Sequence, residues 1–423
     1  MQRNLTPGPS PRERGDEAAR FARTTPLRVI VSGGGTGGHI YPAIAIADEL
    51  KRLRPGTEFL FVGATGKMEM DKVPMAGYEI VGLPIRGLDR TKKLANLSFP
   101  FKLIASLWKS RGIIKSFRPD VVVGTGGYAG GPILYVGAKM GVPTLIQEPN
   151  AFAGLANKWV GKYVDKVCVA FPKMEKFFPK EKLVETGNPV REEMLERVLT
   201  PSPTPPHRGG AHENAERFTG EKLSKELLSN STTPSPVGRA GEGVLLMGGS
   251  GGARSLNEAL RDNTEAIQAR PQVQWTWQCG KNYYDAFKDC ATAQLENVRI
   301  SAFIDDMEAA YSAADLVIGR AGSTTIAEIQ FLGKPTILVP SPWVAEDHQT
   351  MNARALTERE AAVLVADKDT TEKLVATVFK ILDDDELKNK LSTRARAMAQ
   401  TGAVTRIANE VLNLIYSSKN FSK

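Results

Sequence analysis

Short apolar runs that end in glycine or another turn residue recur through two long segments of the chain. They are rich in β-branched residues and continuous rather than alternating, which is typical of parallel strands buried on both faces of a sheet. Helical patterns such as residues 41–54 lie between them, so the sequence predicts α/β folds built on parallel sheets. The expected strands are residues 27–32, 58–62, 121–123 and 144–147 in the first segment, and 244–247, 274–277, 298–300, 316–318 and 336–339 in the second.

Proline-rich sequence precedes the first segment and separates it from the second. Residues 5–11 (LTPGPSP) resemble residues 199–205 (LTPSPTP), and residues 233–236 (TPSP) repeat the pattern again. Such sequence cannot bury enough apolar surface to offset the entropy lost on ordering. The expected organisation is a disordered tail (1–26), an N-terminal domain (27–199), a low-complexity insert and linker (200–243), a C-terminal domain (244–400) and a C-terminal helix packing back toward the N-terminal domain (401–423).

Charge and cysteine content restrict the class of protein. The 55 Lys and Arg exceed the 47 Asp and Glu, and the net charge of +8 favours an anionic partner such as nucleic acid, anionic lipid or a phosphorylated substrate. The 3 cysteines match no zinc spacing, so we expect free thiols. No apolar stretch approaches the roughly 18–20 residues of a spanning helix, and residues 1–26 lack the apolar core of a signal peptide.

Three glycine-rich loops follow expected strands, at residues 33–39 (GGGTGGH), 124–132 (GTGGYAGGP) and 248–254 (GGSGGAR). A glycine run at a helix start presents free N–H groups and the positive end of the helix dipole to an anion. The first loop also fits the G-x-G-x-x-G dinucleotide pattern, but the acidic residue expected at the end of the second strand is missing, since Glu58 stands at its start. A tight turn explains one such loop, whereas three favour ligands that carry diphosphates.

Histidine is scarce in the expected domains. His207 and His212 fall in the insert, which leaves His39 and His348. His39 ends the first glycine loop, at the carboxyl end of a strand, where α/β folds bind ligands. An imidazole there can act as a general base or bind a phosphate, and the alternative is a buried structural histidine.

The sequence resembles the MurG family of peptidoglycan N-acetylglucosaminyltransferases from about residue 27 to 415, with eight motifs in the family's order. They are residues 34–43 (GGTGGHIYPA), 126–132 (GGYAGGP), 147–158 (QEPNAFAGLANK), 186–191 (TGNPVR), 248–254 (GGSGGAR), 303–307 (FIDDM), 320–328 (RAGSTTIAE) and 346–353 (EDHQTMNA). The chain departs from the family at Gln147 and Pro149, where His and Gln are frequent, and in the insert after Leu199.

The resemblance implies a GT-B fold, in which two Rossmann-like, doubly wound domains face a cleft. It implies inverting transfer of N-acetylglucosamine (GlcNAc) from UDP-GlcNAc to the C4 hydroxyl of the muramoyl sugar in undecaprenyl-diphospho-muramoyl pentapeptide (lipid I), giving lipid II. No metal or other cofactor is implied. The expected location is peripheral, on the cytoplasmic face of the plasma (inner) membrane, with an anionic membrane surface and other cell-wall synthesis proteins as partners and no nucleic acid.

The same resemblance assigns site residues. His39 is the expected general base and Glu148 the alternative. For UDP-GlcNAc, the resemblance implies Thr36, Gly37 and Gly38 near the donor sugar, Asn150 on its hydroxyls, Arg191 and Ser250 on the nucleotide or diphosphate, Ile304 on uracil, Ser323, Thr324 and Thr325 on the diphosphate, Glu328 on the ribose and Gln349 on the sugar. For the acceptor diphosphate it implies Gly35, Gly126, Gly127 and Tyr128.

Apolar and basic side chains crowd residues 90–115, which predicts a membrane-facing surface. The apolar members are Leu94, Leu97, Phe99, Phe101, Leu103, Ile104, Leu107 and Trp108, and the basic ones Arg90, Lys92, Lys93, Lys102, Lys109, Arg111 and Lys115. The alternative is a core helix with solvated basic flanks. Residues 305–306 (DD) and 383–385 (DDD) are interpreted as a turn and a helix end rather than as metal ligands.

Other functions remain open from the residues. An NAD-dependent dehydrogenase would use the dinucleotide pattern, and a UDP-sugar epimerase or a glycolipid glycosyltransferase would use the same sugar nucleotide. A non-catalytic sugar-nucleotide sensor or membrane scaffold would need only the binding residues.

Overall fold

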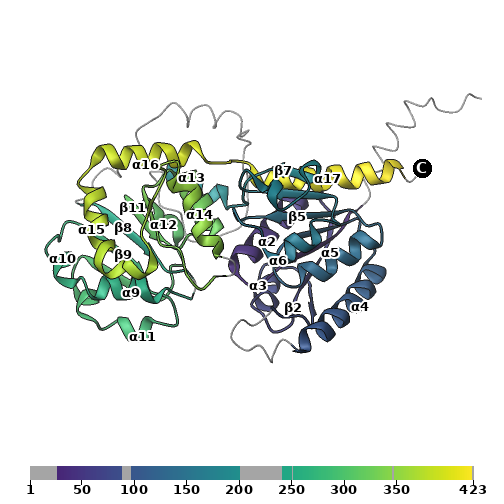
Figure 1. The fold of residues 1–423 in the computed structure, drawn as a ribbon, viewed down its shortest axis with the longest axis horizontal. Helices are drawn as coiled ribbons and strands as arrows, with labels where there is room; N and C mark the ends of the chain where they lie inside the picture. The colour runs from purple at the N-terminus through teal and green to yellow at the C-terminus, as the bar shows by residue number, and fades with distance from the viewer. Residues whose placement is uncertain (1–25, 88–96, 201–240, 250, 345–346, 422–423) are drawn as a thin grey trace, which may run out of the picture.

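The computed structural model describes residues 26–87, 97–200, 241–249, 251–344 and 347–421, which form two α/β halves side by side (Figure 1). The strand order is β3-β2-β1-β4-β5-β6-β7 in the first sheet and β10-β9-β8-β11-β12-β13 in the second, and the strand pairs are parallel. Both sheets therefore begin with the doubly wound order of a Rossmann fold, as predicted.

The first half contains seven strands and the helices that connect them. Its strands are β1 (Arg28–Gly33), β2 (Glu58–Ala64), β3 (Ile80–Leu83), β4 (Val121–Gly126), β5 (Thr144–Glu148), β6 (Lys166–Val169) and β7 (Leu183–Glu185). Its helices are α2 (Gly37–Leu53), α3 (Glu69–Met75), α4 (Phe99–Phe117), α5 (Gly130–Lys139) and α6 (Leu155–Val160), with 3₁₀ turns η2 (Met174–Lys176) and η3 (Lys180–Lys182).

The second half repeats the pattern. Its strands are β8 (Gly243–Met247), β9 (Gln274–Gln278), β10 (Val298–Ser301), β11 (Leu316–Gly319), β12 (Thr336–Leu338) and β13 (Val363–Leu364). Its helices are α9 (Arg254–Arg261), α10 (Thr264–Gln268), α11 (Tyr284–Phe287), α12 (Met307–Ser312), α13 (Ser323–Leu332), α14 (His348–Thr357), α15 (Thr370–Leu382) and α16 (Asp385–Ala397), with 3₁₀ turns η4 (Ala291–Gln294) and η6 (Asp367–Asp369).

Both sheets are buried on their two faces, which explains the continuous apolar runs. In β1, Ile30 packs into one cluster with Ile114 of α4, whereas its neighbour Val31 packs into the opposite cluster with Ile46 of α2. Successive strand residues point to opposite faces, so a strand covered by helices on both sides needs apolar residues at every position.

Each half contributes one helix to the other. Helix α7 (Glu192–Leu199), which the sequence placed in the N-terminal domain, buries Leu195 and Val198 in a cluster with Leu245 of β8 and Leu332 of α13. Helix α17 (Ala403–Phe421) buries Ile407 against α2 and the first sheet. Figure 1 shows α17 lying along the N-terminal half although it ends the chain. The predicted boundary at residue 199 thus differs from the packing by the length of α7.

The two crossing segments, residues 186–192 and 398–406, run side by side, and together they are called the hinge region. Glu192 accepts hydrogen bonds from the Gly402 N–H at 2.7 and 3.0 Å, and Arg406 donates to the Thr186 carbonyl at 2.6 Å. Burial raises the pKa of Glu192 although the N–H groups of Gly402 and Ala403 lower it. The halves are therefore connected by two short stretches of chain that are hydrogen-bonded to each other.

Candidate active site

The first two glycine loops of the sequence pack directly against each other. The Gly34 N–H donates to the Gly126 carbonyl at 3.2 Å, and a Cβ on Gly127 would lie 2.4 Å from the Gly34 oxygen. Gly127 also has a φ of +93°, which L side chains rarely adopt. Close approach of two loops thus explains the glycines at these positions without a bound anion, and the acceptor-diphosphate role of Gly126, Gly127 and the half-exposed Tyr128 stays a prediction.

Glu69, at the start of α3, binds the first glycine loop through its buried carboxylate. Its carboxylate is 1% exposed and accepts the N–H groups of Gly35 and Ala64, each at 2.9 Å. The Gly35 N–H is therefore already paired within the protein, and the acceptor-diphosphate role of Gly35 stays a prediction. Glu69 lies five residues beyond Ala64, the last residue of β2, so the sequence pattern at the strand end does not indicate it.

Helix α2 begins beyond this loop with an open end. His39 and Ile40 donate their N–H groups to the Thr36 carbonyl at 3.1 and 3.2 Å, while Thr36 is exposed and Gly37 and Gly38 are partly exposed. The first N–H groups of a helix have no intrahelical partner and carry the positive end of its dipole. Residues 36–38 are accordingly placed to meet a polar or anionic group.

His39 is fixed by the second loop. Its Nδ1 lies 2.8 Å from the Thr125 carbonyl, and the Thr125 hydroxyl donates to the His39 carbonyl at 2.6 Å. A carbonyl oxygen only accepts, so Nδ1 carries the proton and Nε2 carries the lone pair of the neutral ring. Burial lowers the pKa of His39, the Thr125 carbonyl opposes that shift, and His348 in the other half lowers it further. The ring is thus a neutral imidazole near the boundary between the halves.

Glu148, the alternative base, is committed to its own loop. The side chain is 1% exposed and accepts hydrogen bonds from the N–H groups of Asn150 and Gly154, each at 3.0 Å, and from the side-chain amides of Asn150 at 3.2 Å and Asn157 at 3.0 Å. Burial raises its pKa, and these hydrogen bonds lower it. A carboxylate with four donors is held firmly in its loop, and the role of Glu148 as the alternative base stays a prediction.

The second half supplies a buried carboxylate beside a guanidinium. Glu328 of α13 accepts a hydrogen bond from the Tyr311 hydroxyl at 2.8 Å, and the exposed guanidinium of Arg191 lies 4.0 Å from it. Burial raises the pKa of Glu328, while Tyr311 and Arg191 lower it. The residues predicted for ribose and diphosphate are therefore together, although Arg191 comes from the crossing segment.

The start of α13 is the second open helix end at the boundary. Gly322 precedes it in extended conformation, and Ser323, Thr324 and Thr325 form its first turn. The Thr324 hydroxyl is buried without a hydrogen-bond partner in the described part of the chain. This turn has the unpaired donors that an anion requires.

The loop that leads into α13 is held by an ion pair. Arg320 donates to Asp367, to the Val339 carbonyl at 3.1 Å and to the Ser255 hydroxyl at 3.0 Å. Ser255 in turn donates to Asp367 at 2.6 Å, which ties α9 to the same network. The sequence motif contained Arg320 but did not indicate this role, since Ser255 and Asp367 lie far from it in the chain.

Three further residues are predicted to bind UDP-GlcNAc, namely Ile304, Gln349 and Ser250. Ile304 lies partly buried between β10 and α12, and Gln349 of α14 accepts the Ser341 N–H at 2.8 Å. Ser250 lies outside the described residues. In the third glycine loop, a Cβ on Gly252 would lie 2.2 Å from the Cys279 carbonyl, so close packing again accounts for a glycine.

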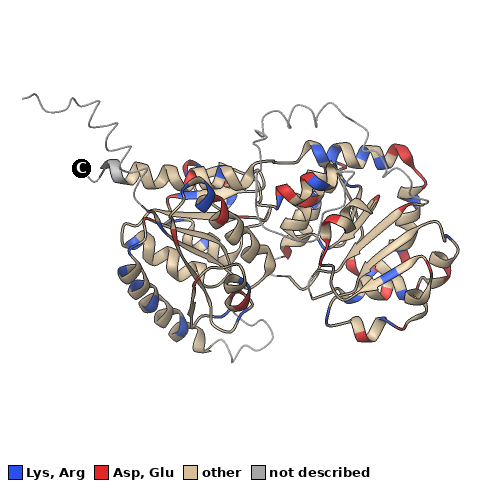
Figure 2. Ribbon diagram, turned by 180° about the vertical axis from the view of Figure 1, so that it is seen from behind, with Lys and Arg blue, Asp and Glu red and all other residues tan. Residues whose placement is uncertain are grey.

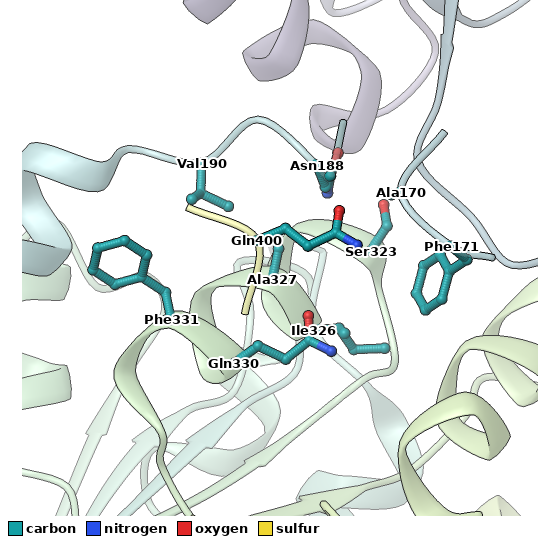
Figure 3. Close-up of a pocket in the computed structure, with 11 residues that line it drawn as sticks. Ala170, Phe171, Asn188, Val190, Ser323, Ile326, Ala327, Gln330, Phe331 and Gln400 are labelled. Atoms are coloured by element: carbon teal, nitrogen blue, oxygen red, sulfur yellow. The ribbon is translucent and has the colours of Figure 1, made fainter. Parts of the chain in front are cut away.

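Figure 3 shows a pocket at the hinge region, between the crossing segments and α13. Gly187, Asn188 and Val190 line it from one side, Gln400 from another, and Ser323 from the first turn of α13. The Asn188 side-chain nitrogen is buried without a hydrogen-bond partner among the described residues. The Asn188 side-chain oxygen, by contrast, accepts a hydrogen bond from the Gln147 amide at 3.1 Å.

The two acidic runs of the sequence, residues 305–306 and 383–385, contain residues with structural roles. Asp306 accepts the Ala309 N–H at the start of α12, and Asp384 accepts the Leu387 N–H at the start of α16, each at 2.9 Å. Asp383 is paired with Arg270 at 2.7 Å. Within the described ranges, no three His, Cys, Asp or Glu side chains gather as metal ligands would.

Comparison with known proteins agrees with this geometry. The models of the glycosyltransferase family 28 N-terminal and C-terminal domains match residues 29–169 and 243–410. The UDP-N-acetylglucosamine--N-acetylmuramyl-(pentapeptide) pyrophosphoryl-undecaprenol N-acetylglucosamine transferase of Parabacteroides distasonis is 47% identical over 389 residues, which cover 92% of this chain and 98% of that protein. The protein of the same name from Porphyromonas gingivalis is 45% identical over 398 residues, covering 93% and 97%.

Among solved structures, the crystal structure of Acinetobacter baumannii MurG matches with a TM-score of 0.67 and 27% identity, covering 92% of this chain and 100% of that one. The two parallel α/β halves confirm the predicted GT-B fold. The chain belongs to the MurG family of family 28 glycosyltransferases.

Proposed function

We propose that this protein transfers GlcNAc from UDP-GlcNAc to lipid I and so produces lipid II for peptidoglycan. The observation that carries this function is the high identity, over more than nine-tenths of both chains, to proteins named for that transfer. The dehydrogenase alternative loses its support because the acidic residue near the first glycine loop, Glu69, binds backbone N–H groups of the protein itself.

The donor occupies the second half in this proposal. The first turn of α13 (Ser323, Thr324 and Thr325) holds the diphosphate, since open N–H groups and the helix dipole favour negative charge. Arg191 adds a positive charge near Glu328, which receives the ribose hydroxyls. The Ile304 backbone meets uracil, and Asn150 and Gln349 meet the sugar.

The reaction is a single displacement at C1 of GlcNAc. The acceptor C4 hydroxyl oxygen forms a bond to C1 while the bond from C1 to the UDP oxygen breaks, and that electron pair leaves with UDP. His39 Nε2 takes the hydroxyl proton, which a neutral ring with Nδ1 bonded to Thr125 is prepared to do. The diphosphate gains charge as it departs, and the α13 dipole and Arg191 stabilise that charge.

The lipid acceptor requires contact with a membrane surface, for which α4 is the proposed element. No helix in the described part of the chain is both long and apolar enough to span a bilayer. On α4, Phe101, Ile104 and Trp108 are 76%, 54% and 77% exposed. Figure 2 shows basic residues along the same outer helix, and Lys102, Lys109, Arg111 and Lys115 belong to it. We propose that this face lies on anionic lipid at the cytoplasmic surface; Leu94, Arg90, Lys92 and Lys93 of the predicted patch lie outside the described residues.

Vesicle sedimentation tests the membrane surface. The double variant Trp108→Ser with Phe101→Ser should bind less to vesicles that contain anionic lipid. Raised salt should reduce vesicle binding by the wild-type protein. Trp343→Ser is the matched control, because Trp343 is 89% exposed on the other half. Equal losses in the two variants would contradict the proposed surface.

Incubation with labelled UDP-GlcNAc and a short-chain lipid I analogue tests the function. The expected product is the analogue carrying one added GlcNAc, with release of UDP. Donor binding without transfer would favour the sensor, and conversion of UDP-GlcNAc without an acceptor would favour the epimerase.

A further inference from the structure

One buried side chain, Asn352 of α14, connects the two halves at the predicted sugar site. It is 0% exposed. Its Oδ1 accepts the Ala151 N–H at 2.8 Å, and its Nδ2 donates to Asn150 Oδ1 at 3.1 Å and to the Ala321 carbonyl at 3.1 Å. Asn150 and Ala151 follow β5 in the first half, whereas Ala321 precedes α13 in the second. The side chain therefore joins three segments that carry predicted site residues.

These contacts fix the orientation of the Asn150 carboxamide. Its oxygen accepts from Asn352, and its nitrogen donates to Glu148 at 3.2 Å. A flip of this amide would place N–H against N–H at Asn352 and oxygen against a carboxylate at Glu148. A carboxamide has two lone pairs and two N–H groups. One of each remains for a ligand, pointing in directions set by the two partners.

The partners come from different parts of the molecule. Glu148 and Asn150 share a loop, so their bond persists whatever the second half does. The bonds of Asn352 to Asn150 and Ala151 exist only while α14 lies against that loop, whereas its bond to Ala321 lies within the second half. The covalent connections between the halves pass elsewhere, through residues 186–192 and 398–406. Opening of the halves about this hinge region would release Asn150 from Asn352 and leave its oxygen unpaired.

We propose that Asn352 is a positioning residue that couples closure of the two halves to the orientation of Asn150. In the closed arrangement, the Asn150 amide meets a hydroxyl of the donor sugar in one orientation. In the open arrangement, the amide is held at its nitrogen alone. The sugar-orienting part rests on the proposed function, whereas the connection between the halves stands on the contacts themselves.

Amide hydrogen exchange at Ala151 tests the connection without any substrate. Asn352→Ala removes the acceptor of this N–H, so exchange at Ala151 should accelerate at least about tenfold while the strand β5 stays protected. Asn297→Ala is the matched control: Asn297 is 6% exposed and donates to the Arg270 and Val273 carbonyls at 3.3 and 2.9 Å, within the second half alone. It should leave Ala151 unchanged, and unchanged exchange in Asn352→Ala would overturn the connection.

A second variant separates a positioning role from a loss of stability. Asn352→Asp keeps an acceptor for Ala151 but cannot donate to Asn150 or Ala321 when ionised, so it should protect Ala151 and still raise the KM for UDP-GlcNAc. Because Asn352 acts through Asn150, the double variant Asn150→Ala with Asn352→Ala should have the kcat/KM of Asn150→Ala alone. Additive losses would overturn the coupling.

The outcomes distinguish this inference from the proposed function. If the wild type transfers no GlcNAc, the function and the sugar-orienting role both fail, and the exchange result still decides the connection between the halves. If the wild type transfers GlcNAc but Asn352→Ala changes neither Ala151 exchange nor KM, the inference fails and the function stands.

Discussion

His39 combines one tautomer, which its hydrogen bond to the Thr125 carbonyl sets, with a pKa that burial lowers. A neutral imidazole accepts a proton, so activity should persist below the ordinary imidazole pKa of about 6.5 and decline as the pH falls through the lowered value. The pH profile of kcat/KM checks this, because the wild type should show an acidic limb with its midpoint below that value. A midpoint above it would contradict the assignment.

The variant His39→Asn isolates the base from its anchoring bond. An asparagine amide can still donate to the Thr125 carbonyl, but it lacks a group equivalent to Nε2. We expect kcat to fall by about 10²–10⁴-fold, the usual contribution of a general base, while the KM for UDP-GlcNAc changes little. Steady-state kinetics at neutral pH measure both, and an unchanged kcat would show that another group takes the proton.

Glu69 should matter for stability because both of its oxygens accept buried N–H groups. Glu69→Gln turns one acceptor into a donor that faces an N–H, and an unpaired buried group costs about 1–3 kcal/mol of unfolding free energy. Chemical denaturation measures the loss. Glu58→Gln is the control, because Glu58 is an exposed surface partner of Arg28, and surface changes of this kind stay within about 0.5 kcal/mol. Equal losses would contradict the account.

These residues differ in how far sequence could reveal them. The sequence indicates His39 as a site residue because it ends a glycine loop after a strand. It does not indicate the roles of Glu69 and Asn352, since each acts through backbone groups that lie far away in the chain or in the other half. A hydrogen bond of this kind has no sequence spacing by which to recognise it.

At the scale of elements, the glycine loops illustrate the same difference. The sequence interpreted them as anion cradles, whereas the close contacts of Gly34 and Gly127 show that loop-on-loop packing accounts for part of the pattern. The nine predicted strands match observed ones, but β3, β6, β7 and β13 were not singled out. They contain at most four residues each, but so do the predicted strands β10, β11 and β12, so length alone does not separate the two groups. Three of them, β3, β7 and β13, lie at sheet edges.

A pair of glycine substitutions tests whether loop packing controls His39. Gly126 and Gly66 both have positive φ, at +111° and +72°, so alanine at either position carries a backbone cost of about 1–2 kcal/mol. A Cβ on Gly126 would lie 2.5 Å from His39 Nδ1, whereas one on Gly66 meets nothing within 4 Å. Gly126→Ala should therefore also reduce kcat, and Gly66→Ala should only lower stability. Equal kcat in the two variants would contradict this role.

At the scale of the whole molecule, α17 makes the first half depend on the end of the chain. Ile407 is fully buried with residues of α2 and the first sheet. Ile407→Ala should lower the free energy of unfolding by about 2–5 kcal/mol. Amide hydrogen exchange should then rise in α2, more than 350 residues earlier in the sequence, before it rises in the second sheet. Asn409→Ala, at an exposed position of the same helix, is the control. Exchange that rises first in the second sheet would contradict this packing.

Helices α7 and α17 each pack on the half opposite to the one they follow in the sequence. This crossing also limits what the sequence predicts for the whole molecule. The sequence predicts a C-terminal helix that packs back toward the N-terminal domain, but it does not say on which sheet residues 192–199 pack. That depends on the hinge region, where Glu192 and Gly402 meet. The position of the boundary between the halves therefore required the structure, while the presence of two halves did not.

The net charge of +8 is consistent with a protein that binds diphosphates and lies on anionic lipid. The proposed mechanism, however, is a single displacement between the halves with His39 as the base. The most direct test is the anomeric configuration of the product formed from UDP-GlcNAc and a lipid I analogue, read by NMR from the anomeric proton. We expect a β-linked GlcNAc from an α-linked donor in the wild type, and almost no product from His39→Asn. An α-linked product would contradict this mechanism, since retention requires a second displacement for which it provides no nucleophile.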